Sequence, residues 1–334
     1  CSSIWGGPGA TSPYCTDKNG HGPAWSNSLF EDNAEHGYGM YTAQKVIREN
    51  LAEKTHALLA IDWTAAELKE AAQKWLDTME DGAANKEAAK AYIAALEESI
   101  CDGCDCDACK LASEILSQKD YLSKKSVWIF GGDGWAYDIG FGGVDHVLAQ
   151  NEDVDTEVYS NPGGQASKAS NIGQVAQFAA AGKETKKKSL AEIAMSYGYI
   201  YVAQVAMGAN QAQTLKAIAE AEAYHGPSLI IGYAPCEMHS IKGGMMHCQE
   251  EMKKAVDCGY WNMFRFDPSK ETGKFTLDSK QPKGGYQEFL MNEARYSRLT
   301  REFPERANEL FERNEESAKA RYEHLLKLVE MYKD

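Results

Sequence analysis

The stretch that decides the fold is Ser126-Val127-Trp128-Ile129-Phe130, which is followed at once by Gly131-Gly132-Asp133-Gly134. A continuous apolar run is typical of a strand that is buried on both faces of a parallel sheet. The glycines stop that strand and let the backbone approach a ligand closely. The sequence therefore predicts a buried strand that leads into a ligand-binding loop.

Strand and helix patterns alternate after this stretch. Apolar runs at 199–203 (Tyr-Ile-Tyr-Val-Ala) and 228–233 (Ser-Leu-Ile-Ile-Gly-Tyr) repeat the strand signature, and helical patterns cover about 142–150 and 210–223. Strands that alternate with helices are typical of a parallel sheet with helical crossovers. We therefore predict an α/β fold with a doubly wound, mostly parallel sheet.

The first part of the chain has a different character. Residues 1–33 are broken by Gly, Pro, Ser and Asn but contain many aromatic residues, so we expect a loop that packs against other parts of the protein. A helical pattern follows from Ala34 to about Glu53. Two further helices, at 64–78 and 84–99, form a predicted hairpin with Asp81-Gly82 as its turn.

These patterns suggest two domains. The α/β domain is predicted over 1–286, with the helical hairpin as an insertion at about 60–120. The remainder, 287–334, has apolar residues on one face of a helical pattern and is predicted to be a helical tail.

Composition excludes several classes of protein. The chain has 334 residues, 43% of them hydrophobic, and 49 acidic against 35 basic side chains, a net charge of −14. Such a charge repels phosphate backbones, so nucleic acid is not an expected partner. No apolar run approaches the roughly 18 residues of a membrane span, and no secretory signal is recognisable, so we expect a cytoplasmic protein. Because the chain begins at Cys1 rather than Met, we expect a processed chain, a subunit or a fragment.

The loop Gly132-Asp133-Gly134 carries the clearest chemical signal. In an open α/β sheet, ligands bind at the carboxyl ends of the strands, where glycines and a following helix can bind phosphate. A carboxylate there can supply an oxygen ligand to Mg²⁺. The alternative is a tight strand-to-helix turn in which Asp133 caps the helix.

A second loop strengthens the first interpretation. It reads Asp155-Thr156-Glu157-Val158-Tyr159-Ser160-Asn161, and 26 residues separate Gly134 from Asn161. This spacing resembles the thiamine diphosphate motif, in which Gly-Asp-Gly precedes an asparagine. Spacing alone would make Asn161 a ligand of the metal.

Longer matches identify one family. The chain resembles the pyruvate:ferredoxin (flavodoxin) oxidoreductases, specifically their C-terminal thiamine diphosphate-binding domain. The matching segments, which extend from Cys1 past Trp261, are Cys1-Ser2-Ser3-Ile4, Trp25 to Glu35, Gly131-Gly132-Asp133-Gly134-Trp135-Ala136-Tyr137-Asp138-Ile139-Gly140 and Asp155 to Asn161. The resemblance covers only the last domain of a much longer polypeptide.

The resemblance implies roles for individual residues. Asp133, the Thr156 hydroxyl and the Val158 carbonyl would hold Mg²⁺. Asn161 would lie near the thiazolium ring and position the substrate, so we follow the family and move the metal-ligand role from Asn161 to Thr156. The residues expected to bind the cofactors are Cys1, Gly132, Asp133, Gly134, Trp135, Thr156, Glu157, Val158, Tyr159, Ser160 and Asn161.

The sequence departs from the family pattern at one point. The family has a hydrophobic strand before the Asp-Thr-Glu-Val-Tyr loop, whereas here Asn151-Glu152-Asp153-Val154 runs directly into Asp155. A buried strand needs about 4–8 residues. Either residues are absent between Val154 and Asp155, or Thr156 cannot reach the metal. We favour absent residues, because the flanking segments match the family so well.

Cysteines carry a second set of expectations. Cys1 and Cys236 match two of the four ligands of the family's proximal [4Fe–4S] cluster, whose usual ligands are thiolates. The other two family ligands lie in a Cys-x-x-Cys segment upstream of Cys1. This chain alone therefore cannot complete the cluster.

A separate group of cysteines is the compact run Cys101-x-x-Cys104-x-Cys106-x-x-Cys109, which is not among the expected ligands of the [4Fe–4S] cluster. Four thiols can form a tetrahedral Zn²⁺ site. The alternative is a metal-free, redox-labile surface insertion. The remaining thiols, at Cys15, Cys248 and Cys258, are interpreted as structural.

The resemblance implies the oxidative decarboxylation of pyruvate to acetyl-CoA and CO₂. Electrons would pass through [4Fe–4S] clusters to ferredoxin or flavodoxin, and the other domains of the same enzyme, as a homodimer, would complete the site. The short basic segment Lys183 with 186–188 is a conceivable dock for an acidic ferredoxin, or simply a solvated helix start. Rival functions are an oxidoreductase for another 2-oxo acid, a silent thiamine-binding fragment, and a zinc-binding scaffold.

Overall fold

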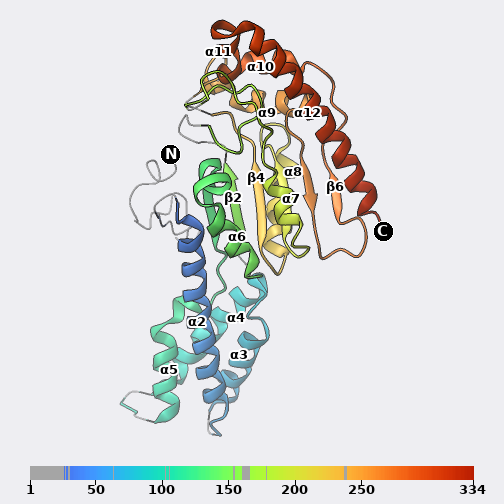
Figure 1. The fold of residues 1–334 in the computed structure, drawn as a ribbon. Helices are drawn as coiled ribbons and strands as arrows, with labels where there is room; N and C mark the ends of the chain where they lie inside the picture. Colours follow the sequence, from blue (N-terminus) through green and yellow to red (C-terminus); the bar gives the residue numbers. More distant parts are fainter. Residues whose placement is uncertain are drawn as a thin grey trace. The chain divides into compact units, whose positions relative to one another are not determined.

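A computed structural model describes most of the chain (Figure 1). It describes residues 26, 28, 31–62, 64–101, 103–104, 106–152, 155–159 (backbone only), 166–177, 179–236 and 239–334. Cys1, Ser160 and Asn161, for which roles were predicted, lie outside the described residues.

The described part of the chain begins with helices, continues with strands and helices together, and ends with helices. In chain order, its elements are α2 (Asn33–Leu59), α3 (Ala66–Asp77), α4 (Gly82–Ser99), α5 (Asp107–Ser117), η1 (Lys119–Tyr121), β1 (Trp128–Gly132), η2 (Gly134–Ile139), α6 (Phe141–Ala149), β2 (Asp155–Tyr159), α7 (Leu190–Met195), β3 (Tyr201–Val205), α8 (Gln211–Ala223), β4 (Ser228–Gly232), η3 (Met245–His247), α9 (Cys248–Asp257), β5 (Phe264–Phe266), β6 (Phe275–Leu277), α10 (Tyr286–Asn292), α11 (Ala294–Glu302) and α12 (Pro304–Met331).

The chain divides into two compact units. A sheet unit contains the described residues up to Gly37 together with Trp128–Asp334, and a helical unit contains Tyr38–Val127. The helical unit starts well before the insertion that was predicted at about 60–120. It does so because α2, which was predicted separately from the insertion, packs Leu51 and Leu58 into the core of the helical unit.

The sheet has six strands in the order β1-β2-β4-β3-β5-β6. The first four are parallel to one another, β5 is antiparallel to β3, and β6 is antiparallel to β5 (Figure 1). The predicted α/β class is thus confirmed. The sheet is mixed, however, and the prediction of a doubly wound parallel sheet is not confirmed. The short antiparallel pair was missed because three-residue strands give too little alternation to recognise.

The predicted strands lie close to their expected places. β1, β3 and β4 each begin within two residues of the apolar runs that predicted them, and all of β4 is buried. Behind β3 and β4, Tyr201, Ala203 and Ile230 pack with Ala217 and Ala221 of α8. Burial on both sides explains why these strands are continuously apolar.

The predicted loop at 155–161 is wrong for Asp155–Tyr159, which form strand β2. Its backbone pairs with β1 on one edge and with β4 on the other, with Thr156 opposite both Ile129 and Leu229. A segment placed between two parallel strands satisfies its backbone groups on both edges, and this outweighs the weak strand propensity of Asp and Glu.

The helical unit has its own core. Trp75, Tyr92, Leu51 and Leu96 are completely buried there, and the Trp75 indole N–H donates to the Leu122 carbonyl at 2.8 Å. The predicted Asp81-Gly82 turn is the start of α4, where the Asp81 carboxylate accepts a hydrogen bond from the Ala84 N–H at 2.9 Å.

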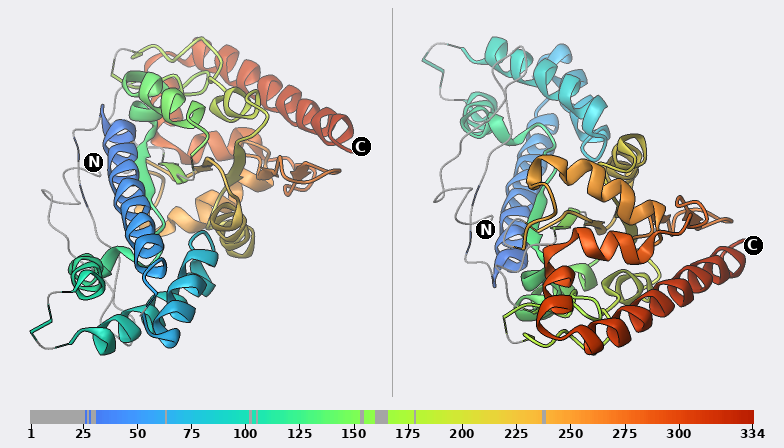
Figure 2. Two further views of the ribbon diagram at one scale, coloured as in Figure 1. Left: turned by 90° about the horizontal axis from the view of Figure 1, so that it is seen from below. Right: turned by 90° about the horizontal axis from the view of Figure 1, so that it is seen from above.

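The predicted helical tail belongs to the sheet unit and is broken into α10, α11 and α12. Glu293 and Pro304 stand at the breaks, the second of them in the first turn of α12. Figure 2 shows α12 as a long helix that runs along one side of this unit to the C-terminus. Among the helices in the described parts of the chain, none is both long enough and apolar enough to cross a membrane.

Candidate functional site

Asp133 stands at the carboxyl end of β1, directly before the π-helical turn η2. The residue is buried, and its carboxylate accepts a hydrogen bond from the Ser167 hydroxyl at 2.7 Å. Ser167 is itself held by the Ala169 N–H, which donates to the hydroxyl oxygen at 3.0 Å. The Asp133 carboxylate makes no capping bond to η2 within the described residues, so the helix-cap interpretation of this aspartate fails.

Trp135 fills the space behind this loop. A side chain at Gly131 or Gly140 would collide with the buried Trp135 ring, so both positions need glycine. The Trp135 indole N–H is buried and has no hydrogen-bond partner among the described residues. The Gly-Gly-Asp-Gly-Trp segment therefore places a buried carboxylate and an unsatisfied donor two residues apart.

We expect Gly131→Ala to lower the free energy of unfolding by about 1–3 kcal/mol, because the added methyl group overpacks the Trp135 ring. Gly142→Ala is the matched control: nothing lies within 4 Å of the added carbon, and alanine favours the helix α6. Urea unfolding of both variants checks this. Equal stability of the two variants would contradict the packing account.

A small cavity of about 20 Å³ lies beside Asp133. Its lining comes from the carboxyl ends of β1 and β4 and from later segments of the chain. The lining residues are Asp133, Tyr137, Ala169, Gln174, Lys187, Ile231, Gly232, Tyr233, Tyr260, Trp261 and Arg295. Ligands of open α/β sheets bind at this edge, so the cavity is in the expected place.

Charged groups in this cavity influence one another. Burial lowers the pKa of Lys187 to about 8, although the negative charge of Asp133 opposes that change. The Lys187 ammonium also lies 4.9 Å from the centre of the Trp261 ring. Burial, and then the Asp133 charge, raises the pKa of Tyr137 above its ordinary value. Asp133 thus faces a cation and a neutral phenol.

A buried ion pair forms another wall of the cavity. Arg295 Nε lies 2.8 Å from Glu293 Oε2, and the Tyr233 hydroxyl donates to Glu293 Oε1 at 2.8 Å. Burial, followed by the Glu293 charge, raises the pKa of Tyr233 well above its usual range. These contacts join Glu293 and Arg295, at the start of α11, to Tyr233, which directly follows β4.

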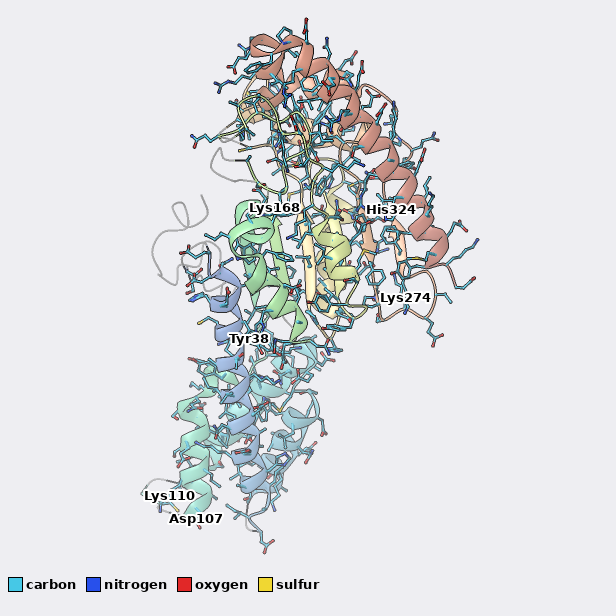
Figure 3. All side chains as sticks on the ribbon, in the orientation of Figure 1. Tyr38, Asp107, Lys110, Lys168, Lys274 and His324 are labelled. Carbon is cyan, nitrogen blue, oxygen red and sulfur yellow. The ribbon has the colours of Figure 1, made fainter. Side chains whose placement is uncertain are left out.

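The predicted basic segment borders a wider groove of about 580 Å³. The lysines that line this groove have different roles. Lys183 donates to the Ser167 and Ser170 carbonyls at 2.9 and 2.7 Å, and Lys168, labelled in Figure 3, pairs with Asp138 at 2.9 Å. Lys186 is exposed, and helix α7 begins soon after it at Leu190.

Strand β2 brings the Tyr159 backbone opposite Gly132, directly before Asp133, but it holds the two predicted metal ligands farther back. Thr156 lies opposite Ile129, four residues before Asp133, and Val158 lies opposite Gly131. At about 3.3 Å per residue, the Thr156 backbone is on the order of 13 Å from that of Asp133 along the strands. Cys236 is buried four residues after β4, and Cys1 is outside the described residues.

Sequence patterns missed three residues of this site. Ser167, Lys187 and Arg295 converge on the cavity or its carboxylate from distant segments. Only Lys187 had a signal, as a member of a basic run. Ser167 and Arg295 are flanked in the sequence by mostly polar residues, and such a pattern is equally typical of an exposed segment.

Comparisons with known proteins bear on this geometry. Residues 109–231 match the family described as the thiamine pyrophosphate enzyme, C-terminal TPP binding domain. The matched range contains Asp133, Ser167 and Lys187, together with β1, β2, β3 and all but the last residue of β4.

Similar proteins extend over nearly the whole chain. Pyruvate:ferredoxin oxidoreductase of Moorella thermoacetica is 51% identical over 338 residues, which are 99% of this chain and 28% of the relative. Pyruvate-flavodoxin oxidoreductase of Klebsiella pneumoniae is 48% identical over 340 residues, 98% of this chain and 28% of the relative. Mitochondrial pyruvate dehydrogenase [NADP(+)] of Euglena gracilis is 44% identical over 340 residues, 99% of this chain and 18% of the relative.

The chain therefore spans less than a third of the length of these relatives. The resemblance drawn from the sequence motifs is confirmed: residues 109–231 match the C-terminal TPP binding domain, and the chain is similar over almost all of its length to the pyruvate-flavodoxin and pyruvate:ferredoxin oxidoreductases.

Proposed function

We propose that this chain is the thiamine diphosphate-binding part of an enzyme that oxidatively decarboxylates pyruvate to acetyl-CoA and CO₂. The observation that carries the proposal is the buried, non-capping Asp133 carboxylate at the carboxyl edge of β1, inside the range that matches the TPP-binding domain. Pyruvate is proposed because the three relatives named above differ in their electron acceptor but share this substrate in their names.

The residues present fit a magnesium diphosphate in part. Asp133 offers the oxygen ligand that Mg²⁺ prefers, and the unsatisfied Trp135 N–H is a buried donor two residues away. In the proposed site, Gly132 to Trp135 and 156–161 contact thiamine diphosphate, and Thr156 and Val158 complete the magnesium ligands. In β2, however, the Thr156 backbone pairs with Ile129, four residues before Asp133.

The register of β2 suggests how this discrepancy is resolved. Thr156 pairs with Ile129, so a shift of four residues along β1 would place Thr156 opposite Asp133. We propose that about four further residues belong between Val154 and Asp155 and form the strand, as in the related family. Mass spectrometry of the peptide that spans 144–168, taken from the native source, tests this: a mass equal to that of the present sequence would refute it.

The chain's own residues prepare the site for this chemistry. Thiamine diphosphate, when bound, supplies an electron sink for decarboxylation of a 2-oxo acid. Asp133 would hold the metal, Ser167 fixes the orientation of that carboxylate, and Asn161 would position the substrate. The wall of Tyr233, Trp261 and Arg295 limits the space that water can enter.

Electron transfer needs parts that this chain does not supply alone. We propose that Cys236 and Cys1 are two of the four ligands of a [4Fe–4S] cluster, as the resemblance implies. Burial of Cys236 close to the carboxyl end of β4 supports this for the first of them. The remaining domains, arranged as a homodimer in the cytoplasm, would complete the cluster and bind coenzyme A.

Ferredoxin or flavodoxin is the proposed electron acceptor, after the names of the bacterial relatives. Lys186, exposed beside the groove described above, can contribute to a dock for an acidic carrier. The neighbouring Lys183 is engaged with backbone carbonyls, so its role is structural.

The decisive experiment uses the complete protein purified without oxygen. We expect ferredoxin or flavodoxin to be reduced only when pyruvate, coenzyme A and thiamine diphosphate are all present. Substituting other 2-oxo acids for pyruvate tests the rival substrate class. Binding of thiamine diphosphate with no turnover of any 2-oxo acid would overturn the proposal.

A second candidate is a thiamine-binding core without catalytic activity. The register of β2 favours it, because a site in which Asp133 is the one side-chain ligand among the described residues would hold Mg²⁺ weakly. The same experiment distinguishes the two, since the silent core predicts cofactor binding without electron transfer.

A further inference from the structure

The loop between α4 and α5 gathers thiols that the proposed function does not use. The Sγ atoms of Cys104, Cys106 and Cys109 all lie within 4.8 Å of one another. A tetrahedral zinc site with Zn–S bonds of about 2.3 Å holds its sulfur atoms about 3.8 Å apart. The three thiols are therefore within about 1 Å of the spacing that a single ion requires.

Local backbone structure brings these thiols together. Gly103 has φ of 70°, and the Cys104 N–H donates to the Cys101 carbonyl at 3.2 Å, so 101–104 form a tight turn. Nothing lies within 4 Å of a carbon added at Gly103, which shows that the turn, rather than crowding, requires glycine. The turn ends at Cys104, whereas the Cys101 thiol at its start is not part of the group of three.

Helix α5 supplies the other half of the cluster. Cys106 precedes its first turn and Cys109 lies three residues later, a spacing that places two side chains on the same helix face. Asp107 and Lys110, labelled in Figure 3, mark this end of α5.

The four thiols differ in their exposure to solvent, which bears on how an ion could reach them. Cys109 is buried and Cys106 is half-buried, whereas Cys101 and Cys104 are exposed. An ion can therefore enter from solvent and meet one anchored ligand. The Cys101 thiol contacts the Ser99 carbonyl at 3.9 Å, a weak interaction that a metal bond would readily replace.

We propose that Cys101, Cys104, Cys106 and Cys109 bind one Zn²⁺ ion, with the last three as a preassembled set and Cys101 as the fourth ligand. Bound zinc would join the ends of α4 and α5 and stabilise the helical unit, because the ion binds only the folded arrangement. A four-iron cluster fits less well, since its ligand sulfurs are spread around a larger body than a single ion.

The test measures zinc in the complete protein, purified without oxygen and dialysed against buffered Zn²⁺. We expect the Cys104→Ser/Cys106→Ser double variant to contain one zinc fewer per chain than the unchanged protein. Cys248→Ser is the matched control: this half-buried thiol is outside the cluster, and its replacement should leave the zinc content unchanged.

Two further measurements keep the test decisive if the double variant folds poorly. Cys101→Ser alters only an exposed thiol, and we expect it to weaken Zn²⁺ binding more than about tenfold. Replacement of zinc by Co²⁺ should produce thiolate-to-cobalt charge-transfer absorption, and Zn²⁺ should protect four thiols from alkylation. Equal zinc content in all variants, iron in place of zinc, or a disulfide within 101–109 would each overturn the proposal.

Discussion

Replacing Asp133 by asparagine is expected to weaken the Mg²⁺-dependent binding of thiamine diphosphate by more than about 100-fold. The amide keeps the size of the side chain and can still accept the hydrogen bond from Ser167, so the fold should be retained. It loses the negative charge, and a neutral amide is a much poorer ligand for Mg²⁺ than a carboxylate. Titration with thiamine diphosphate, followed by tryptophan fluorescence or calorimetry, measures the effect.

Asp257→Asn is the control for this substitution. Asp257 ends α9 at the surface, where it pairs with Lys283 at 3.0 Å, and its replacement should leave binding of the cofactor unchanged. If Asp133→Asn binds thiamine diphosphate as tightly as the control does, the carboxylate is not a metal ligand. The proposed site would then be wrong, whatever the relatives of the chain do.

The second large effect is expected at the buried ion pair behind the cavity. Glu293→Ala leaves the Arg295 charge buried without its partner, and breaking such a pair costs about 3–5 kcal/mol of unfolding free energy. The Tyr233 hydroxyl also loses its acceptor. Urea unfolding of the complete protein measures the change.

Two comparisons separate the ion pair from general sensitivity of α10 and α11. Glu288→Ala removes an exposed carboxylate of α10 and should change stability by no more than about 0.5 kcal/mol. The double variant Glu293→Gln/Arg295→Met removes both charges, and it should be more stable than Glu293→Ala. A double variant that is as unstable as the single one would show that Arg295 is not stranded by loss of Glu293.

Several features followed from the sequence because short-range chemistry controls them. The apolar runs that became β1, β3 and β4 have no other way to hide their side chains than a sheet buried on both faces. Helix α4 begins where Asp81 can cap it. The glycines that end β1 before Asp133 were recognisable as the end of a strand, and the long motif matches identified the related family.

Other features depended on what each segment meets in the fold. Asp155–Tyr159 form a strand because β1 and β4 lie on either side of them, which no local pattern shows. Helix α5 was missed because its first turn follows a run of cysteines that has no helical periodicity. The convergence of Lys187 and Arg295 on Asp133 joins segments that are 54 and 162 residues distant from it in the sequence.

The sequence by itself thus determined the α/β class, the strand that leads to Asp133 and the related family. Only the tertiary structure decided that the sheet is mixed, that Thr156 is held within β2, and that three cysteine sulfurs come together at the start of α5. The physical reason is the range of the interactions. Burial and capping act on neighbouring residues, whereas strand pairing and the meeting of charges depend on segments that only the folded chain brings together.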